Sequence, residues 1–331
     1  MRTFTDNRVR AMVVVASIAI AAAVAYPAAA PSAPVAIELC AKAGTAALPN
    51  LPGGASTVPI WGFALKGAAA DCSDVTATIP GPQITADEGD VVTLKITNAL
   101  PAGAAATDHA ISLEVPGIGF DAGPTDVRVG DTLTRTFTAS AAGTYLYLSA
   151  GGAGRQEAMG LSGALVVRPA TAGRAYSDAS TAYDVQKTLV LGEIDPALNN
   201  APDPDTYDML RWDPKYWLIN GKVHPDTGPI SVPAGQNLLL RYVNAGLEHA
   251  TMTLLGRHMR LVGQDANALA NPISVVAQTL PAGATADGIV TAGAAGSSYP
   301  LYNRQLHLTN GDCCGSGYAP GGMMTFINVS P

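Results

Sequence analysis

Residues 91–97 read Val-Val-Thr-Leu-Lys-Ile-Thr, a run in which apolar and mainly polar side chains alternate. A period of two places Val92, Leu94 and Ile96 on one face of a strand and the other residues on the opposite face. Similar short runs follow, separated by Gly, Pro and Asp turn residues, at 111–115, 132–137, 144–147 and 164–167. Regular spacing of short strands predicts a β-sandwich or barrel between residues 81 and 169.

A second strand series begins at Tyr216-Trp217-Leu218-Ile219 and repeats this plan, at 238–243, 250–255, 259–262, 273–277, 305–309 and 324–329. Residues 170–214 have weaker periodicity, with one strand-like run at 188–191, and we interpret them as a linker. The expected organisation is therefore a first domain at 34–169, a linker at 170–214 and a second domain at 215–331.

The composition agrees with an all-β protein of about two domains. Of the 331 residues, 48% are hydrophobic and only 14% are charged, with 35 Gly and 24 Pro, so tight turns are favoured over long surface helices. The net charge is −7, and Lys and Arg form no cluster along the chain. Nucleic acids and anionic membrane surfaces are bound through such clusters, so we expect neither as a partner.

The amino terminus has the pattern of a secretory signal peptide. Arg2, Arg8 and Arg10 precede the uncharged apolar run 11–26, and small residues follow at 28–33. We expect residues 1–33 to be a signal peptide and the mature protein to be secreted or extracytoplasmic. The alternative is an uncleaved anchor, although the run of about 16 residues is shorter than the roughly 20 that a spanning helix needs.

An exported protein folds in an oxidising compartment, where cysteines form disulfides. Cys40 and Cys72 are the natural pair among the four cysteines. They would close a loop of about 33 residues, and the bond would stabilise the fold by about 3–4 kcal/mol. Cys313 and Cys314 are adjacent, so a bond between them would be strained.

Several motifs together resemble multicopper oxidases. The stretches 80–84, 88–92 and 97–101 look like the opening of the first cupredoxin domain of that family, and 143–147 and 159–167 look like its closing strands. In the second segment, 218–221, 244–246 and 321–324 are similar to a later cupredoxin domain. The resemblance implies two cupredoxin-like Greek-key β-sandwich domains in tandem.

The resemblance also implies where copper ligands should stand, and these residues depart from the pattern. The family uses four His-x-His patterns for its trinuclear cluster, whereas this chain has five histidines and no His-x-His. In register, Glu114 and Pro116 replace the first pair of ligands, and Leu148 and Ala150 replace the second. Leucine, alanine and proline side chains offer copper no donor atom.

The second segment fits the family in two ways. When it is compared with the middle domain of three-domain members, which carries no copper, no copper ligand is missing from it. Compared with the last domain, Thr253 and Leu255 stand at another missing histidine pair, while Cys313 and Met323 fall at the type 1 copper Cys and axial Met. On that register Tyr318 replaces one type 1 histidine, and His249 lies one residue away from the position of the other.

Two interpretations of Cys313 and Met323 follow. In the first, they form a remnant soft-metal site completed by His249 or His307. In the second, which we favour, the cysteine belongs to a Gly-rich loop and the methionine begins a core strand. A less favoured hypothesis is a metal site formed by His258 and Met252. We again favour the interpretation that the methionine packs in the core. His109 is expected to be a surface residue in a turn.

These observations favour an exported, multicopper-oxidase-like protein that lacks the trinuclear copper ligands and acts as a non-catalytic binding or structural module. We expect no oxidase activity and no cofactor, with copper as the one metal that the resemblance leaves open. The alternative is a copper-binding or weak redox protein with a remnant type 1-like site. The partners that we consider are an extracellular ligand and a second copy of the chain.

Overall fold

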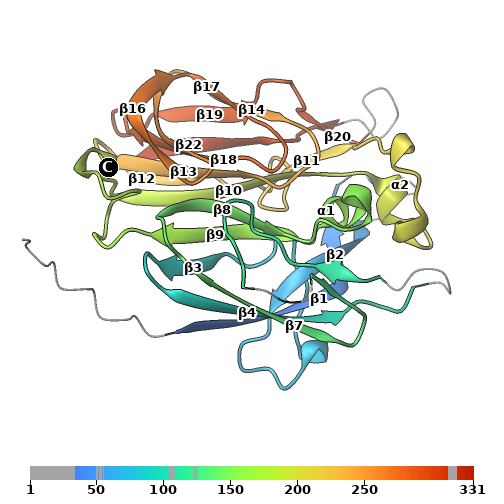
Figure 1. Cartoon of the computed structure of the whole chain (residues 1–331). Coiled ribbons are helices and arrows are strands. Elements are labelled where there is room, and N and C mark those ends of the chain that lie inside the picture. Colours follow the sequence, from blue (N-terminus) through green and yellow to red (C-terminus); the bar gives the residue numbers. More distant parts are fainter. Residues whose placement is uncertain are drawn as a thin grey trace, which may run out of the picture. The chain divides into compact units, whose positions relative to one another are not determined.

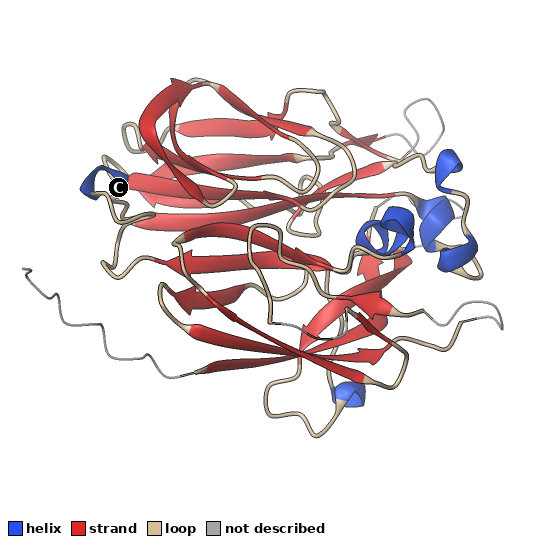
Figure 2. Cartoon of the chain, viewed as in Figure 1, coloured by secondary structure: helices blue, strands red, loops and turns tan. Residues whose placement is uncertain are grey.

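The computed structural model describes residues 34–331 apart from 50, 52–53, 55, 104–108, 122, 124 and 312–318. The described residues belong to one compact unit. They are mostly strands, and the few helices are single turns (Figure 2). None of the helices in this part of the chain has the length and hydropathy of a membrane span.

The first sandwich packs a four-stranded sheet against a three-stranded one. The four-stranded sheet has the order β2 (Thr57–Leu65), β1 (Val35–Ala47), β4 (Val91–Ala99), β7 (Thr132–Thr138). The three-stranded sheet has the order β3 (Ile84–Asp87), β9 (Ser162–Arg168), β8 (Gly143–Leu148). A short hairpin joins β5 (Ile111–Ser112) to β6 (Asp126–Val127).

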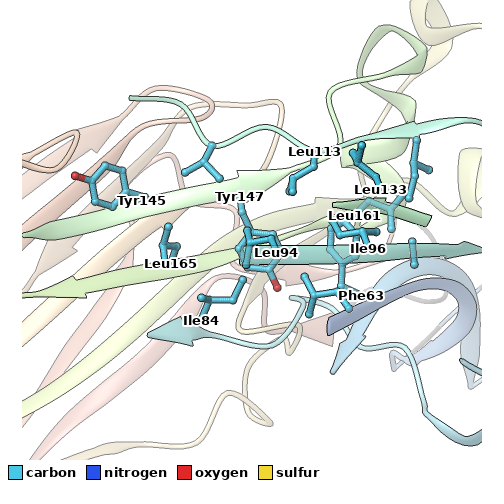
Figure 3. Packing of buried hydrophobic residues seen from close by; sticks show 14 of the residues in the cluster. Phe63, Ile84, Leu94, Ile96, Leu113, Leu133, Tyr145, Tyr147, Leu161 and Leu165 are labelled. Atoms are coloured by element: carbon cyan, nitrogen blue, oxygen red, sulfur yellow. The ribbon is translucent and has the colours of Figure 1, made fainter. Parts of the chain in front are cut away.

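The core of this sandwich lies between the two sheets. Leu94 and Ile96 of β4 are fully buried and face Leu165 of β9 and Tyr147 of β8 within one cluster (Figure 3). The predicted alternation of residues 91–97 is thus confirmed, because Val92 is buried as well while the intervening side chains are partly exposed. Burial of each large apolar side chain contributes about 1.5–3 kcal/mol.

The second sandwich contains a six-stranded and a five-stranded sheet. The first has the order β11 (Tyr216–Ile219), β10 (Val185–Ile194), β13 (Asn237–Asn244), β18 (Thr285–Thr291), β15 (Met259–Gln264), β16 (Asn267–Val275). The second has the order β12 (Ile230–Pro233), β22 (Met324–Ser330), β19 (Ser298–Asn303), β14 (Ala250–Leu254), β17 (Ala277–Leu280). A two-residue pair joins β20 (Thr309–Asn310) to β21 (Ala319–Pro320).

The helical turns lie in the connections. They are α1 (Arg155–Met159), α2 (Pro196–Asn199), and the 3-10 turns η2 (Cys72–Asp74), η3 (Gly152–Gly154), η4 (Ala179–Thr181), η5 (Pro204–Thr206) and η6 (Met209–Arg211). Aspartate side chains cap most of them; Asp195, for example, accepts a hydrogen bond from the Ala197 amide at the start of α2.

Most of the predicted strands are present, and three differences have physical causes. β10 lies inside the segment 170–214, and it pairs with β13 of the second sandwich instead of only linking the two segments. The predicted strand at 305–309 is wrong, because Leu306 adopts a φ of 65° in a turn and only Thr309 belongs to a strand. β1 and β2 were not predicted, since the burial of β1 does not follow a period of two.

The predicted disulfide between Cys40 and Cys72 is confirmed. It joins β1 to η2, and both cysteines pack with Ala64 in a small buried cluster. The Lys42 ammonium group donates hydrogen bonds to the Cys72 and Val75 carbonyl oxygens, at 2.6 Å each. The covalent link and the lysine together hold the connection 66–75 against the edge of the first sandwich.

Strand β8 contacts β13 and β18 of the second sandwich, and Figure 1 shows β8 and β9 beside β10 and β13. A polar network lies at this contact. The Asp287 carboxylate accepts hydrogen bonds from the Thr144 hydroxyl and the Tyr176 phenol, both at 2.7 Å. Arg241 Nη1 donates to the Thr144 hydroxyl at 3.0 Å and lies 3.5 Å from Asp287 Oδ2.

The network is closed to water, because Arg241 is 0% and Asp287 1% exposed. Gly143 allows β8 to approach the second sandwich closely, since a Cβ atom there would lie 2.7 Å from Ala266. A buried charge that loses its partner is strongly destabilising, so the Arg241–Asp287 pair stays together, and Thr144 of β8 bonds to both of its members.

We predict that Asp287→Asn lowers the free energy of unfolding by about 3–5 kcal/mol, because the Arg241 charge stays buried without its partner. The matched control is Asp87→Asn, which breaks the Arg168–Asp87 pair, whose side chains are 51% and 53% exposed. An exposed pair contributes about 0–1 kcal/mol. Urea unfolding measures both variants, and equal small losses would contradict the role given to the network.

Candidate functional site at the contact of the sandwiches

The positions where the family resemblance places copper ligands lie together in the structure. Glu114 and Leu148 face each other as an antiparallel bridge, with both N···O hydrogen-bond distances at 2.9 Å. Pro116 and Ala150, the partner positions in each pair, are exposed. The structure therefore pairs one position from each of the two inferred ligand pairs, and of the four side chains only that of Glu114 carries a donor atom.

The Leu148 side chain takes part in an apolar contact between the sandwiches. It is 6% exposed and packs in one cluster with Leu146, Val190, Val243 and Ala245. These side chains come from β8, from the strands β10 and β13, and from the residue after β13. Copper(II) prefers imidazole and thiolate donors, so this set of residues does not fit the trinuclear copper cluster of the family.

The residues predicted for a remnant metal site are only partly brought together. Cys313, together with Cys314 and Tyr318, lies outside the described residues. Met323 is fully buried in the core of the second sandwich, and its amide donates a hydrogen bond to the His307 carbonyl oxygen at 3.0 Å. His249 is exposed and His307 is half-buried.

The His307 ring is held in a defined orientation. It stacks on the Trp217 indole with ring centroids 4.1 Å apart, and its Nδ1 lies 3.3 Å from the Asn303 amide nitrogen. Burial lowers the pKa of His307, an effect that Glu248 opposes and His249 reinforces. A neutral imidazole is the form that binds metal ions, so His307 is the better ligand of the two histidines.

The other histidines have other surroundings. Met252 is fully buried and packs in the core, whereas His258 is exposed in the turn before β15, in agreement with the core interpretation of Met252. The expectation for His109 is wrong: it is 4% exposed, and its ring contacts the Trp61 ring at a centroid distance of 4.7 Å.

A pocket that the sequence analysis did not identify opens beside the apolar contact. It is lined by residues from α1, from β10 and from the turn at 245–246. Apolar side chains line most of it together with two acids, among them Ile79, Met159, Val190, Ala245, Glu157 and Glu193. We call it the interface pocket.

Glu193 is the more deeply buried of the two acids, at 7% exposed. Its Oε2 accepts a hydrogen bond from the Leu247 amide at 3.1 Å. Gly246 allows the backbone to approach the Glu193 carboxyl group closely, because a Cβ atom at that position would lie 2.0 Å from Oε2. Burial raises the pKa of Glu193 to about 8, and the negative charges of Glu248 and Glu157 add to the effect.

Glu157 on α1 is affected in the same direction. Burial raises its pKa to about 7, with a further contribution from the charge of Glu114. At neutral pH Glu193 therefore mostly keeps a proton that an exposed glutamate would have released, and Glu157 keeps its proton about half of the time. They can donate hydrogen bonds while protonated, and they can exchange their protons for a bound cation.

One signal in the sequence could have pointed to Glu193. It stands in the run Leu189-Val190-Leu191-Gly192-Glu193-Ile194, where an acid interrupts an otherwise apolar strand. An acid in a buried strand is rare unless it is paired or protonated. Glu157 gives no such signal, because its burial depends on how α1 packs against residues distant in the chain.

We predict that wild-type stability falls as pH rises from about 4.5, the ordinary pKa of glutamate, through about 8. Folding keeps the Glu193 proton that the unfolded chain has lost, and each pKa unit corresponds to about 1.4 kcal/mol. Glu193→Gln should flatten this decrease and be more stable than wild type at pH 8, by a few kcal/mol in urea unfolding.

Glu88→Gln is the control for this prediction, because Glu88 is exposed and the variant should keep the wild-type pH profile. Glu157 is present in both variants, and its raised pKa makes the free energy of unfolding decrease further as pH rises to about 7. The assignment fails when Glu193→Gln and wild type follow the same curve between pH 5 and pH 8.

Comparison with known proteins agrees with this architecture. The sequence model of the multicopper oxidase family matches residues 63–172. A copper-containing nitrite reductase of Alcaligenes xylosoxydans xylosoxydans is 27% identical over 249 residues, which cover 68% of this chain and 72% of the relative. Copper resistance protein A of Escherichia coli is 29% identical over 134 residues, covering 39% of this chain and 20% of that protein.

Two solved structures from Nitrosomonas europaea have the same fold. A blue copper oxidase superposes with a TM-score of 0.71 at 23% identity, covering 90% of this chain and 86% of its own. A copper nitrite reductase superposes with a TM-score of 0.67 at 19% identity, covering 90% and 94%. Residues 63–172 thus match the multicopper oxidase family model, and the described residues share the cupredoxin-like fold of these solved structures.

Proposed function

We propose that this protein is an exported, non-catalytic binding or structural module built on the multicopper oxidase-like fold. The observation that carries the proposal is the pairing of Glu114 with Leu148. The Leu148 side chain packs in an apolar cluster at a position where the family resemblance calls for a histidine ligand. Export rests on the signal-peptide pattern, and the Cys40–Cys72 disulfide supports an oxidising compartment.

The interface pocket is the binding site that we propose. Its walls are mainly apolar, and Glu157 and Glu193 are the charged groups among its lining residues. Such a site favours a small ligand, or a side chain of a partner, that is apolar in body and donates hydrogen bonds or carries positive charge. Dioxygen reduction is not supported, because it needs coppers that these side chains do not hold.

The alternative, a copper-binding or weak redox protein, rests on the orientation of His307. Trp217 and Asn303 hold its ring, and burial lowers the pKa of the imidazole. Met323, His249 and Cys313 would complete a remnant type 1-like site. This alternative requires the Cys313 thiol to reach the same place.

We predict that Cys313→Ser leaves the copper content of the reconstituted and dialysed mature protein unchanged, and that the protein does not oxidise a generic phenol with dioxygen. Metal analysis by mass spectrometry and oxygen uptake give the two readouts. One copper per chain that is lost in Cys313→Ser, but kept in the control His258→Asn, would establish the alternative. Turnover of the phenol would contradict the non-catalytic function.

A further inference from the structure

Three potential metal ligands meet away from the copper positions. His109 lies just before β5, and Asp203 and Asp205 lie at the start of η5. In the described part of the chain they are the one group of three His, Cys, Asp or Glu side chains whose ligand atoms all come within 4.8 Å of one another. The His109 side chain is 5% exposed, and the two aspartates are 12% and 15% exposed.

The hydrogen bonding of His109 determines which nitrogen faces the carboxylates. Its Nδ1 lies 2.7 Å from the Pro101 carbonyl oxygen, which can only accept, so Nδ1 carries a proton. Nε2 then faces Asp203 Oδ1 at 3.2 Å and Asp205 Oδ2 at 3.9 Å. A neutral Nε2 presents a lone pair to these oxygens, so either a second proton or a metal ion must lie between them.

The separations suit a metal ion. Ligand atoms at about 2.0–2.1 Å from a tetrahedral zinc ion lie about 3.4 Å from each other, and the two observed distances fall on either side of that value. A ligating histidine commonly donates its other ring N–H to a backbone carbonyl, as His109 does to Pro101. The Trp61 ring packs on His109 and limits its rotation.

We propose that His109, Asp203 and Asp205 bind a divalent transition-metal ion, with one imidazole nitrogen and two carboxylate oxygens as protein ligands. This donor set, intermediate between hard and soft, suits Zn(II), and the partial exposure of the aspartates leaves a position for water. The ion would join the connection after β4 to the segment between α2 and η6. None of these three residues lines the interface pocket, so failure of the metal site would leave the proposed function untouched.

The test is a titration of the metal-free mature protein with Zn(II) by calorimetry, with Co(II) absorption as an independent readout of tetrahedral coordination. We expect one zinc ion per chain, an increase in melting temperature on adding zinc, and binding at least about tenfold weaker in Asp205→Asn, which keeps the shape of the side chain. His307→Asn is the matched control, and it should bind zinc as wild type does.

Two results would overturn the proposal. One is equal zinc binding by wild type and Asp205→Asn, or zinc binding that is lost in His307→Asn. The other is no zinc binding by wild type, with Asp205→Asn lowering the melting temperature to the same extent with and without zinc. That second pattern would identify His109 and the aspartates as an ion pair. His109→Asn serves as a second variant where Asp205→Asn does not fold.

Discussion

Every side chain of β8 is buried, and the strand divides its side chains between two cores. Tyr145 and Tyr147 point into the first sandwich, whereas Leu146 and Leu148 pack against strands of the second. Thr144, on the same face as Leu146, donates its hydroxyl proton to Asp287. Side chains alternate along a strand, so a one-residue shift of β8 would exchange the side chains on its two faces. Both sets of contacts would then be lost.

This constraint connects the docking of the sandwiches to the absence of copper ligands. A trinuclear copper site needs imidazoles on the face of β8 where Leu148 lies, and there the chain has apolar packing instead. Glu157 and Glu193 lie beside the same contact, and the protons that they keep reduce the cost of burying them. The contact is thus a packed interface beside a mainly apolar pocket that contains two acids.

Much of the fold could be predicted from local patterns. β4 alternates strictly, and β11 coincides with the run Tyr216–Ile219 that the sequence marked. The positions of Glu114 and Leu148 followed from the order of family motifs. β1 was missed because its burial depends on β2 on one side and β4 on the other, so its pattern is irregular.

The sites were harder to predict, because they depend on tertiary contacts. Glu157 and Glu193 come from different sandwiches, and their raised pKa values result from burial that no short pattern encodes. His109 was assigned to the surface because it follows an aspartate in a turn-like stretch. The partners that enclose it, Trp61 and Asp203, are distant in sequence.

The most direct test of the central claim is anomalous diffraction at the copper edge from crystals of the mature protein soaked in Cu(II). The account predicts no ordered copper beside Glu114 and Leu148, where the apolar cluster continues across the contact of the sandwiches. A strong anomalous peak bonded there to side chains of both sandwiches would contradict it.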